Sequence, residues 1–517
     1  MAELLSPDAA DRLRAHAEAR IGAGDMMGVA AAVTDVAGAE TVITAGCADA
    51  AGSPLRPGHL LQIGSISKSF AAICALQLEA EGALSLDDEL VRHLPWFRVG
   101  KGRGPITLRH LLMHRSGLPT GSDPAPSSAA LIGEMARAET EWAPGERFWY
   151  SNVGYDAVGM ALEAVTGEGF PQIIRRRVLD PLGMAASAAH IAPQHRERLA
   201  DGFEPLHPDR PRHPGSPLAT APFTVSEGAS GSIVSTASDM ARYVRHLLGS
   251  GPVGFDRMIA GLPDDEGSPY GLGVWITERK GHRIVGHSGG MVGYVAQMLC
   301  DMDAGLGVIS LANGPGGART VAEYALDLAR AEHEGADLPD PPADGAADLT
   351  PYHGTYGPVT VTAAGIEANG RSGGLAEHAT DEYTTDHPDL TESFVRFGRG
   401  GDGRVDHVIL ADSWYPADSS TGPREFPHPP EWEGYPGVYR SHNPWLAAVR
   451  VTLSRGSLGA EPSGHGHKPL TPHPSGGFAW TAGEVRLPER MHFSEVVDGR
   501  AQRLEWGGCL LCRAARH

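Results

Sequence analysis

The stretch 64–70, Gly-Ser-Ile-Ser-Lys-Ser-Phe, constrains this chain more than any other. It precedes a mostly apolar run, 71–80, that predicts a helix, and Gly64 with Ser65 is typical of a helix start. Residues three apart share one face of a helix, so Ser65 and Lys68 are expected side by side. An amine beside a serine can take the hydroxyl proton when burial and positive potential keep the amine partly neutral. The stretch therefore predicts a nucleophile, although Ser-x-x-Lys alone is equally typical of a capping serine and a solvated lysine.

Two later stretches carry groups that suit the same chemistry. The tripeptide 150–152, Tyr-Ser-Asn, combines a hydroxyl that can relay a proton with an amide that can hold a substrate carbonyl and Lys68 together. The stretch 287–290, His-Ser-Gly-Gly, is expected at the start of a strand, where glycines let a substrate backbone lie close to the sheet edge. A free N–H at Gly290, with that of Ser65, would form an oxyanion hole. We predict a catalytic group of Ser65, Lys68 and Tyr150, and a substrate-binding group of Asn152, His287, Gly289 and Gly290.

The length and the charge of the chain limit the number of domains and the kinds of partner that can be expected. With 517 residues the chain is too long for one ordinary core, so two or three domains are expected. A hydrophobic content of 41% and a charged content of 21% are typical of a soluble globular protein. The net charge of −20 argues against a nucleic-acid or anionic-membrane partner. A small molecule or a short peptide is therefore the expected substrate.

The cysteines and the N-terminus give expectations about compartment and cofactors. The 5 cysteines are scattered and odd in number, which does not suit a disulfide framework. Cys509 and Cys512 form a lone Cys-x-x-Cys pair, which we interpret as strand packing because no second pair stands at zinc spacing. Residues 1–8 lack the apolar core of a signal peptide, and no run of about twenty apolar residues exists. We expect a cytoplasmic protein without a metal, a cofactor or a membrane span.

The order of predicted elements gives an α/β domain over residues 1–335. We expect an antiparallel sheet with helices on both faces and an all-helical region after Ser65. His114, near the end of one of these helices, is tempting as a catalytic base but is interpreted as a structural histidine that closes the helix. The principal predicted elements are helices at 8–22, 157–166 and 318–331, and strands at 28–35, 41–46, 271–277, 293–301 and 306–312.

The remainder of the chain has a different composition. Residues 336–350 are rich in Pro, Asp and Ala, which predicts a linker. Beyond them helix signals vanish, and an internal echo relates 352–356, Tyr-His-Gly-Thr-Tyr, to 435–439, Tyr-Pro-Gly-Val-Tyr. We predict two small antiparallel β-barrels, at 351–425 and at 426–517.

Taken together, Ser65-x-x-Lys68, Tyr150-x-Asn152 and His287-x-Gly289 occur in the order and rough spacing of one family. The sequence resembles the serine β-lactamase and penicillin-binding-protein superfamily, and is similar to its class C-like branch of esterases, D-aminopeptidases and related acyltransferases. The resemblance covers about residues 8–335 and implies a β-lactamase-like catalytic domain that forms an acyl-serine. D-aminopeptidases of this type carry two small antiparallel barrels after that domain. The duplicated tail is similar to this layout, which implies a lipocalin-like second barrel.

One departure from the resemblance bears on the substrate. Penicillin-recognising enzymes usually have a lysine where this chain has His287, which is mostly neutral at cytoplasmic pH. The site is therefore better suited to amides, esters or the N-terminal end of a peptide than to free carboxylates. We expect a serine hydrolase that cleaves an amide or ester, such as the N-terminal bond of D-amino acid amides or peptides. The alternative on the same fold is an acyltransferase or cyclising thioesterase that passes the acyl group to an amine.

Two competing interpretations can be weighed on the sequence. Residues 286–290 also spell Gly-x-Ser-x-Gly, the nucleophile elbow of α/β-hydrolases, but that elbow must join a strand to a helix and a strand is expected here. A catalytically dead binding or sensor module would not need Ser65, Lys68, Tyr150 and Asn152 intact.

The last domain offers one further candidate. The segment 471–484 is rich in Gly and Pro, which suits a loop between strands that reaches a substrate. Phe478 and Trp480 would cover an apolar acyl group and Glu484 would meet an ammonium, whereas the ordinary interpretation makes the two aromatics part of a barrel core.

Overall fold

The protein forms two compact units, and each is built from two stretches of the chain. The first unit comprises Met1–Glu204 and Pro217–Pro342, and the second comprises Pro205–Ser216 and Ala343–His517. The segment 205–216 thus leaves the first unit and joins the second, which the sequence did not indicate. This computed structural model describes residues 2–121, 132–133, 135–137, 140–225, 228–249, 255–259, 269–342, 347–420, 422–462, 464–482 and 485–515.

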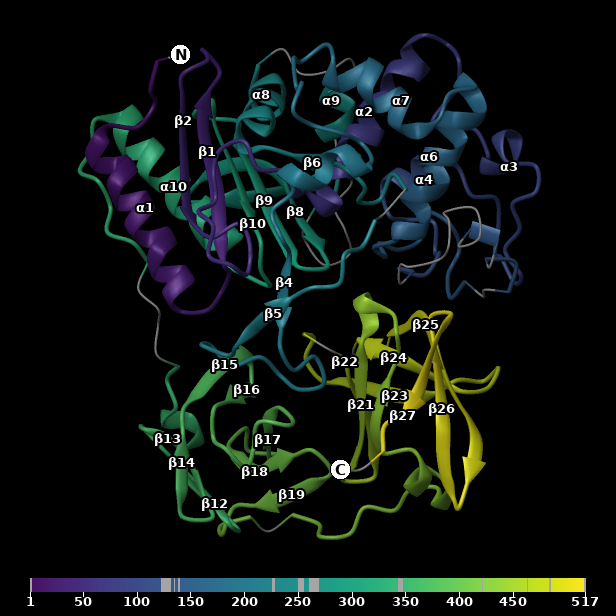
Figure 1. The fold of residues 1–517 in the computed structure, drawn as a ribbon. Coiled ribbons are helices and arrows are strands. Elements are labelled where there is room, and N and C mark those ends of the chain that lie inside the picture. Colours follow the sequence, from purple (N-terminus) through teal and green to yellow (C-terminus); the bar gives the residue numbers. More distant parts are fainter. Residues whose placement is uncertain are drawn as a thin grey trace. The chain divides into compact units, whose positions relative to one another are not determined.

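The first unit is built on one antiparallel sheet of six strands, in the order β2-β1-β10-β9-β8-β7 (Figure 1). Every residue of β1 except the last is buried, because this strand lies inside the sheet with helices over both faces. The strands of this sheet are β1 Gly28–Asp35, β2 Glu40–Gly46, β7 Trp275–Arg279, β8 His282–Met291, β9 Tyr294–Asp301 and β10 Leu306–Ala312. Two short pairs complete the unit, β3 Leu61–Gln62 with β6 Val234–Ser235 and β4 Phe203–Pro205 with β5 Leu218–Thr220.

Helices α1 and α10 cover one face of this sheet, and α8 packs on the other face (Figure 1). Leu13, Val29 and Val321 share one core between α1, the sheet and α10. A group of helices around α2 forms an all-helical region beside the sheet (Figure 1). The helices are α1 Pro7–Gly22, α2 Ser67–Ala80, α3 Leu90–His93, α4 Leu108–Leu112, α6 Asn152–Thr166, α7 Phe170–Ile174, α8 Ala237–Leu248, α9 Phe255–Ile259 and α10 Ala318–Glu334. The predicted α/β class, with an antiparallel sheet and a helical region, is confirmed.

Two elements that carry predicted site residues differ from the expectation. Helix α6 begins at Asn152, earlier than the predicted start at 157, because Ser151 caps it and its Oγ accepts the Gly154 N–H at 3.0 Å. A separate strand, β8, precedes the predicted strand 293–301, so His287 lies inside a strand rather than at its start. The sequence analysis did not predict β8 as a separate strand, because its glycines have low strand propensity.

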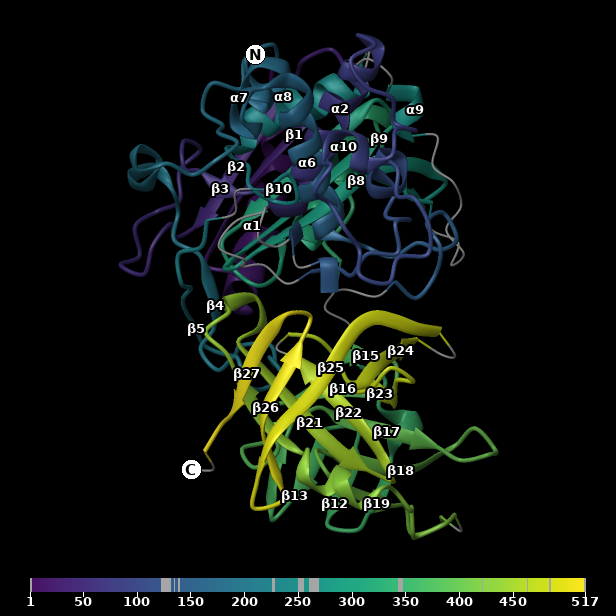
Figure 2. The same ribbon diagram turned by 90° about the vertical axis from the view of Figure 1, so that its right-hand side faces the viewer.

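The second unit contains two groups of antiparallel strands (Figure 2). The first group forms sheets of four and five strands that share one core, and a bridge between Tyr356 and Ala417 joins the first strand of one to the chain after the last strand of the other. The second group is a closed barrel of eight strands, β20 to β27. The first group has β11 Gly354–Tyr356, β12 Val359–Thr362, β13 Gly365–Ala368, β14 Arg371–Gly373, β15 Leu375–Ala379, β16 Glu382–Thr385, β17 Val395–Arg399, β18 Val405–Leu410 and β19 Ser413–Pro416. The barrel has β20 Gly437–Arg440, β21 Ala448–Ser454, β22 Ser457–Pro462, β23 Lys468–Pro472, β24 Phe478–Ala482, β25 Val485–Val497, β26 Arg500–Trp506 and β27 Cys509–Arg513.

The sequence echo in the tail corresponds to a repeated local contact. The Tyr356 hydroxyl donates to the Tyr352 carbonyl at 2.9 Å, and the Tyr439 hydroxyl donates to the Tyr435 carbonyl at 2.7 Å. In both copies the donating tyrosine is buried and lies on the first strand of its group. The repeated tyrosines therefore anchor the first strand of each group by the same hydrogen bond.

The described part of this segment, 471–482, belongs to a hairpin of β23 and β24 rather than to a long loop. Phe478 is only 6% exposed and belongs to the barrel core, against which Trp480 packs. Of the two interpretations of these aromatics, the barrel-core one therefore fits Phe478, and Trp480 is partly buried against that core. Glu484 lies outside the described residues.

The described part of the chain contains no helix that is both long enough and apolar enough to span a membrane.

Gly64 generates a prediction about stability. Its φ is +52°, and a Cβ atom on it would lie 2.6 Å from the Gly290 nitrogen on β8. Gly64→Ala combines a left-handed backbone with a contact against main chain, so we expect the free energy of unfolding to fall by about 1–3 kcal/mol. Chemical denaturation measures the change. Gly58→Ala is the matched control, because a Cβ there meets no atom within 4 Å, and equal losses in the two variants would contradict the prediction.

Candidate active site

Ser65 and Lys68 lie where the sequence predicts, at the start of helix α2. Ser65 belongs to a 3₁₀ turn, Gly64–Ile66, that leads directly into α2, and Lys68 lies in the first turn of that helix. The Lys68 side chain is 0% exposed, and its Nζ lies 2.9 Å from the Ser65 Oγ. Lys68 is therefore a buried amine in hydrogen-bond contact with a serine hydroxyl, not the solvated lysine of the alternative interpretation.

Two further oxygens surround the Lys68 amine. The Asn152 Oδ1 accepts from Nζ at 2.8 Å, and the Ser230 carbonyl oxygen accepts from it at 2.7 Å. Asn152 is held because it is the first residue of α6, and its N–H donates to the Thr120 carbonyl at 2.8 Å. The structure thus brings Ser65, Lys68 and Asn152 together across 84 residues of sequence, and it adds Ser230, which the sequence analysis did not single out.

Tyr150 completes the predicted catalytic group. Its hydroxyl forms a hydrogen bond with the Ser65 side chain, and its ring centroid lies 4.9 Å from the Lys68 Nζ. Burial raises the pKa of Tyr150 above its ordinary value, and the hydrogen bond with Ser65 opposes this rise only in part. At neutral pH Tyr150 is therefore a neutral phenol that can donate a proton, not a phenolate base.

His114 holds the Tyr150 segment in place, a structural role that the sequence analysis did not specify. Its carbonyl accepts the Trp149 N–H at 2.7 Å and its Nδ1 accepts the Ser151 N–H at 2.9 Å, so the two bonds bracket Tyr150. The His114 ring lies 4.1 Å from the Tyr150 ring, centroid to centroid. Burial, with the charge of Lys68, lowers the pKa of His114 well below its ordinary value. His114 is therefore a neutral acceptor that positions Tyr150 and does not act as a cationic group.

Strand β8 approaches Ser65 through its glycines. A Cβ atom on Gly289 would lie 1.9 Å from the Ile63 carbonyl oxygen, and one on Gly64 would lie 2.6 Å from the Gly290 nitrogen. Only glycine permits this contact between the turn that carries Ser65 and the main chain of β8. The outer neighbour, β7, pairs with β8 no farther than Gly286, so within the described sheet the stretch 287–291 is paired on one side only, with β9. Of the predicted binding residues, His287, Gly289 and Gly290 therefore lie on a strand edge beside Ser65, whereas Asn152 lies on α6.

His287 is buried and neutral. Burial lowers its pKa to about 3, and the charge of Lys68 adds to the effect. A neutral imidazole carries one proton, and Nδ1 lies 2.5 Å from the Ser288 carbonyl oxygen, which can only accept. Nδ1 therefore carries the proton, and Nε2 accepts from the Tyr270 hydroxyl at 3.0 Å. Histidine at this position thus supplies no positive charge at neutral pH, in line with the sequence expectation.

Tyr270 is a site residue that the sequence analysis missed. Besides its hydrogen bond with His287, its ring packs 4.8 Å from the His114 ring, centroid to centroid. The ring centroids of His287 and Tyr150 are 6.2 Å apart, and the hydrogen bond of His287 goes to Tyr270. The available signal was an aromatic residue beside the glycine turn 271–273, just before a strand.

Ser288 does not have the setting of a nucleophile elbow. It lies within β8, between Gly286 and Gly290, and the chain continues through a turn into β9 rather than into a helix. Its carbonyl is engaged by His287. The elbow interpretation therefore fails on the structural context that it requires.

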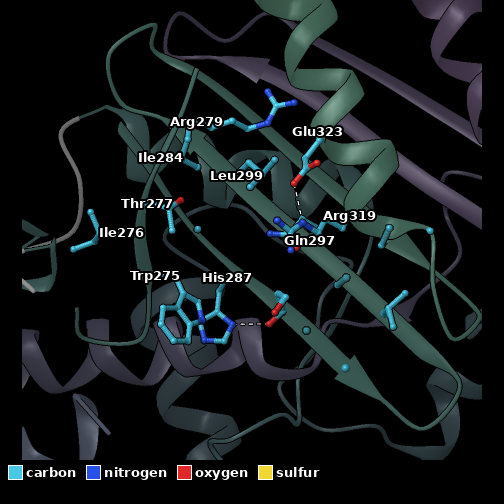
Figure 3. Close-up of a pocket in the computed structure, with 18 of the residues that line it drawn as sticks. Trp275, Ile276, Thr277, Arg279, Ile284, His287, Gln297, Leu299, Arg319 and Glu323 are labelled. Atoms are coloured by element: carbon cyan, nitrogen blue, oxygen red, sulfur yellow. Dashed lines mark hydrogen bonds and ion pairs between the residues drawn. The ribbon is translucent and has the colours of Figure 1, made fainter. Parts of the chain in front are cut away.

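A pocket of about 1280 Å³ lies along β7, β8, β9 and the start of α10 (Figure 3). Trp275, Ile284 and Leu299 give it apolar walls, and the Arg319 guanidinium there pairs with Glu323 at 2.8 Å. His287, Gly289 and Gly290 line it, but Ser65, Lys68 and Tyr150 do not. The predicted catalytic group therefore does not line this pocket, which offers space along the β8 edge.

One group of side chains in the described residues is close enough to share a metal ion, namely His282, Asp301 and Asp303. Asp301 is fully buried and is already paired with the Arg330 guanidinium at 2.5 Å. Arg330 thus supplies the positive charge that an ion would bring, and the arrangement is that of a structural ion pair.

Known proteins with similar sequences are found for the part of the chain that carries this site. A family model described as Beta-lactamase matches residues 13–332. Protein flp of Staphylococcus aureus (strain MW2) is 26% identical over 275 residues, which is 50% of this chain and 53% of that protein. Penicillin-binding protein 4* of Bacillus subtilis (strain 168) is 28% identical over 322 residues, 56% of this chain and 69% of that protein. The chain thus matches about half the length of the staphylococcal relative.

Two solved structures are similar as well. The octameric penicillin-binding protein homologue from Pyrococcus abyssi has a TM-score of 0.57 and 22% identity, covering 78% of this chain and 99% of its own. A D-stereospecific amidohydrolase from Streptomyces sp. has a TM-score of 0.52 and 25% identity, covering 63% of this chain and 99% of its own. The first of these supports the fold alone.

The neutral state of His287 generates a prediction about pH. Because its folded pKa is about 3 and its ordinary value is 6.5, the unfolded chain binds a proton between these values that the folded chain does not. This group alone therefore lowers the free energy of unfolding as the pH falls below 6.5, by up to about 1.4 kcal/mol per pH unit. His287→Gln should flatten that part of the stability curve. The rate at which a fluorophosphonate labels Ser65 falls at acid pH, and we expect the midpoint of this fall to be the same in His287→Gln and in the wild type. A shifted midpoint would show that His287 titrates in the site.

Proposed function

Because the chain belongs to the beta-lactamase family through residues 13–332, we propose that it is a serine hydrolase that forms an acyl-enzyme on Ser65. The observation that carries the proposal is the 2.9 Å contact between the buried Lys68 Nζ and the Ser65 Oγ. Burying a charged amine costs several kcal/mol of folding free energy, because the charge is removed from water. A role in activating Ser65 would account for this cost. Lys68, Tyr150 and Asn152 are the proposed partners of the nucleophile.

The surroundings of Lys68 suit a base in its neutral form. A neutral amine has two N–H groups and one lone pair. The Asn152 Oδ1 and the Ser230 carbonyl oxygen can only accept from Nζ, so they take the two N–H groups. The lone pair is then directed at Ser65, whose proton passes to Nζ as Oγ bonds to the substrate carbonyl carbon.

Tyr150 is proposed to protonate the leaving group. When the tetrahedral intermediate collapses, the bond to the leaving nitrogen or oxygen breaks and that atom takes the Tyr150 phenolic proton, which the Lys68 ammonium replaces. The raised pKa of Tyr150 suits this role, because the group is protonated at the start of each cycle. Water then attacks the acyl-enzyme, releases the acid and restores the Ser65 hydroxyl.

The oxyanion is assigned to the N–H groups of Ser65 and Gly290. The close approach of Gly64 to the Gly290 main chain supports this pair, because it holds β8 directly beside the turn that carries Ser65. Backbone donors fixed in this way stabilise the charge that develops on the carbonyl oxygen.

We propose amides and esters without a free carboxylate next to the scissile bond as the substrate class, with D-amino acid amides or the N-terminal bond of peptides as the leading example. The neutral His287 supports this choice, because it offers no cation to a carboxylate. The similarity to a D-stereospecific amidohydrolase, at 25% identity, supports the amide and its stereochemistry.

The assignment of the nucleophile predicts the behaviour of two serine variants. Ser65→Ala should lose turnover by about 10⁴-fold or more and should lose labelling by a fluorophosphonate, because a coupled catalytic group fails when one member is removed. Ser288→Ala should keep both within about threefold, since Ser288 contributes its main chain to His287. Intact-mass spectrometry of the labelled chain is the measurement. Labelling that survives Ser65→Ala but disappears in Ser288→Ala would assign the chemistry to the elbow.

A substrate panel tests the proposed class. D- and L-amino acid p-nitroanilides, simple esters and nitrocefin are each assayed alone and with an added amine. We expect hydrolysis of the D-anilides and esters and a kcat/KM for nitrocefin at least about 100-fold lower. Turnover of nitrocefin at the rate of the esters would contradict the substrate class. Faster release with the amine than with water would favour the acyltransferase.

A further inference from the structure

The base in this site depends on the position of one main-chain carbonyl. Of the two acceptors that direct the Lys68 lone pair, Asn152 is a side chain of helix α6, whereas Ser230 offers the carbonyl of an irregular turn. Such a turn has no helix or strand ladder to hold it, so its position must be set by its contacts. The contacts of Ser230 therefore decide where Lys68 directs its lone pair.

Asp156 makes the contact that holds this turn. Its Oδ1 accepts the Ser230 N–H at 3.0 Å, and both residues are buried, at 3% and 6% exposure. Asp156 follows Asn152 by four residues on α6, so the two side chains share one face of the helix. Ser230 thus donates its N–H to Asp156 and accepts with its carbonyl from Lys68. Lys68 and Ser230 are 162 residues apart in sequence.

The packing of α6 against this turn is close enough for the bond to be specific. A Cβ atom on Gly159, one turn beyond Asp156, would lie 2.9 Å from the Ala229 Cβ. On the other side of the turn, a Cβ on Gly231 would lie 3.8 Å from the Gly64 main chain. The turn is therefore fitted between α6 and the segment that carries Ser65, and Asp156 fixes its orientation there.

We propose that Asp156 is a positioning residue for the base: through the Ser230 peptide it holds the second acceptor of Lys68. Helix α6 then supplies both acceptors, Asn152 directly and Ser230 by way of Asp156. Asp156 lies on a buried stretch of α6 with Val153, Tyr155 and Val158, where a carboxylate is costly for folding. The proposed role in positioning Ser230 explains why it is there. The inference rests on the proposed function, because it assigns Asp156 a part in activating Ser65.

The test compares two kinds of substitution at Asp156. Asp156→Leu removes the acceptor, and Asp156→Asn keeps an amide oxygen of the same reach. Labelling of Ser65 by a fluorophosphonate is followed as a function of probe concentration, which separates the maximal rate constant from the half-saturating concentration. We expect Asp156→Leu to lower the maximal rate constant by about 100-fold with little change in half-saturation, because the probe does not touch Asp156. Asp156→Asn should recover the rate constant to within about tenfold of the wild type.

Glu163→Leu is the matched control. Glu163 also lies on α6, and its Oε1 accepts a main-chain N–H, that of Phe170 at 2.6 Å, away from Lys68. Its loss should cost stability without changing the labelling rate, which separates positioning from a general loss of structure. If Asp156→Leu does not fold, Asp156→Ala, which adds no volume, replaces it with the same expectation.

The outcomes separate the inference from the proposed function. Wild-type protein that is not labelled on Ser65 would overturn the proposed function and with it the inference. Labelled wild type with equal rate constants in folded Asp156→Leu would overturn the inference alone. Asp156→Asn as slow as Asp156→Leu would also overturn it, because the charge rather than the hydrogen bond to Ser230 would then matter.

Discussion

The burial of the Lys68 amine is the constraint on which the rest of the site depends. Helix α2 is buried on nearly every face, and Lys68 is 0% exposed within it. An amine in such a place requires acceptors in fixed positions, because water cannot supply them. Asn152 and Ser230 come from other segments, so the Lys68 Nζ joins α2, α6 and the turn at Ser230 by hydrogen bonds.

Burial determines the protonation state of the groups around this amine, and for the two histidines the charge of Lys68 adds to the effect. Both nearby histidines, His114 and His287, are buried, and the charge of Lys68 lowers the pKa of each further. Both are therefore neutral, and each uses its ring as a hydrogen-bond acceptor: His114 for the Ser151 N–H and His287 for the Tyr270 hydroxyl. Tyr150 remains a phenol in these surroundings. A site with one buried amine and neutral partners matches the proposed chemistry, in which a single proton moves between Ser65, Lys68 and Tyr150.

Glycine is the second constraint, since it lets two main chains meet. Gly64 and Gly289 leave no room for a Cβ, and together they bring the 3₁₀ turn of Ser65 against strand β8. In the second unit the repeated contact is instead a tyrosine hydroxyl on the carbonyl four residues before it, once in each group of strands. The internal echo in the sequence thus marks anchors of the tail rather than residues of a site.

The sequence by itself determined the residue types and the local pairings of this protein. Ser65 and Lys68 are three apart at a helix start, and Asn152 follows Tyr150 by two residues. The short apolar runs in 28–35 and 306–312 predict strands, because these signals depend on neighbours in the chain. The fold class and most elements of the sheet followed. What only the tertiary structure decided are contacts between distant segments: Ser230 on Lys68, Asp156 on Ser230, Tyr270 on His287, and the state of each histidine. No local pattern encodes them, because a main-chain carbonyl has no sequence signature and the protonation of a side chain depends on its burial, which exists only after the chain has folded.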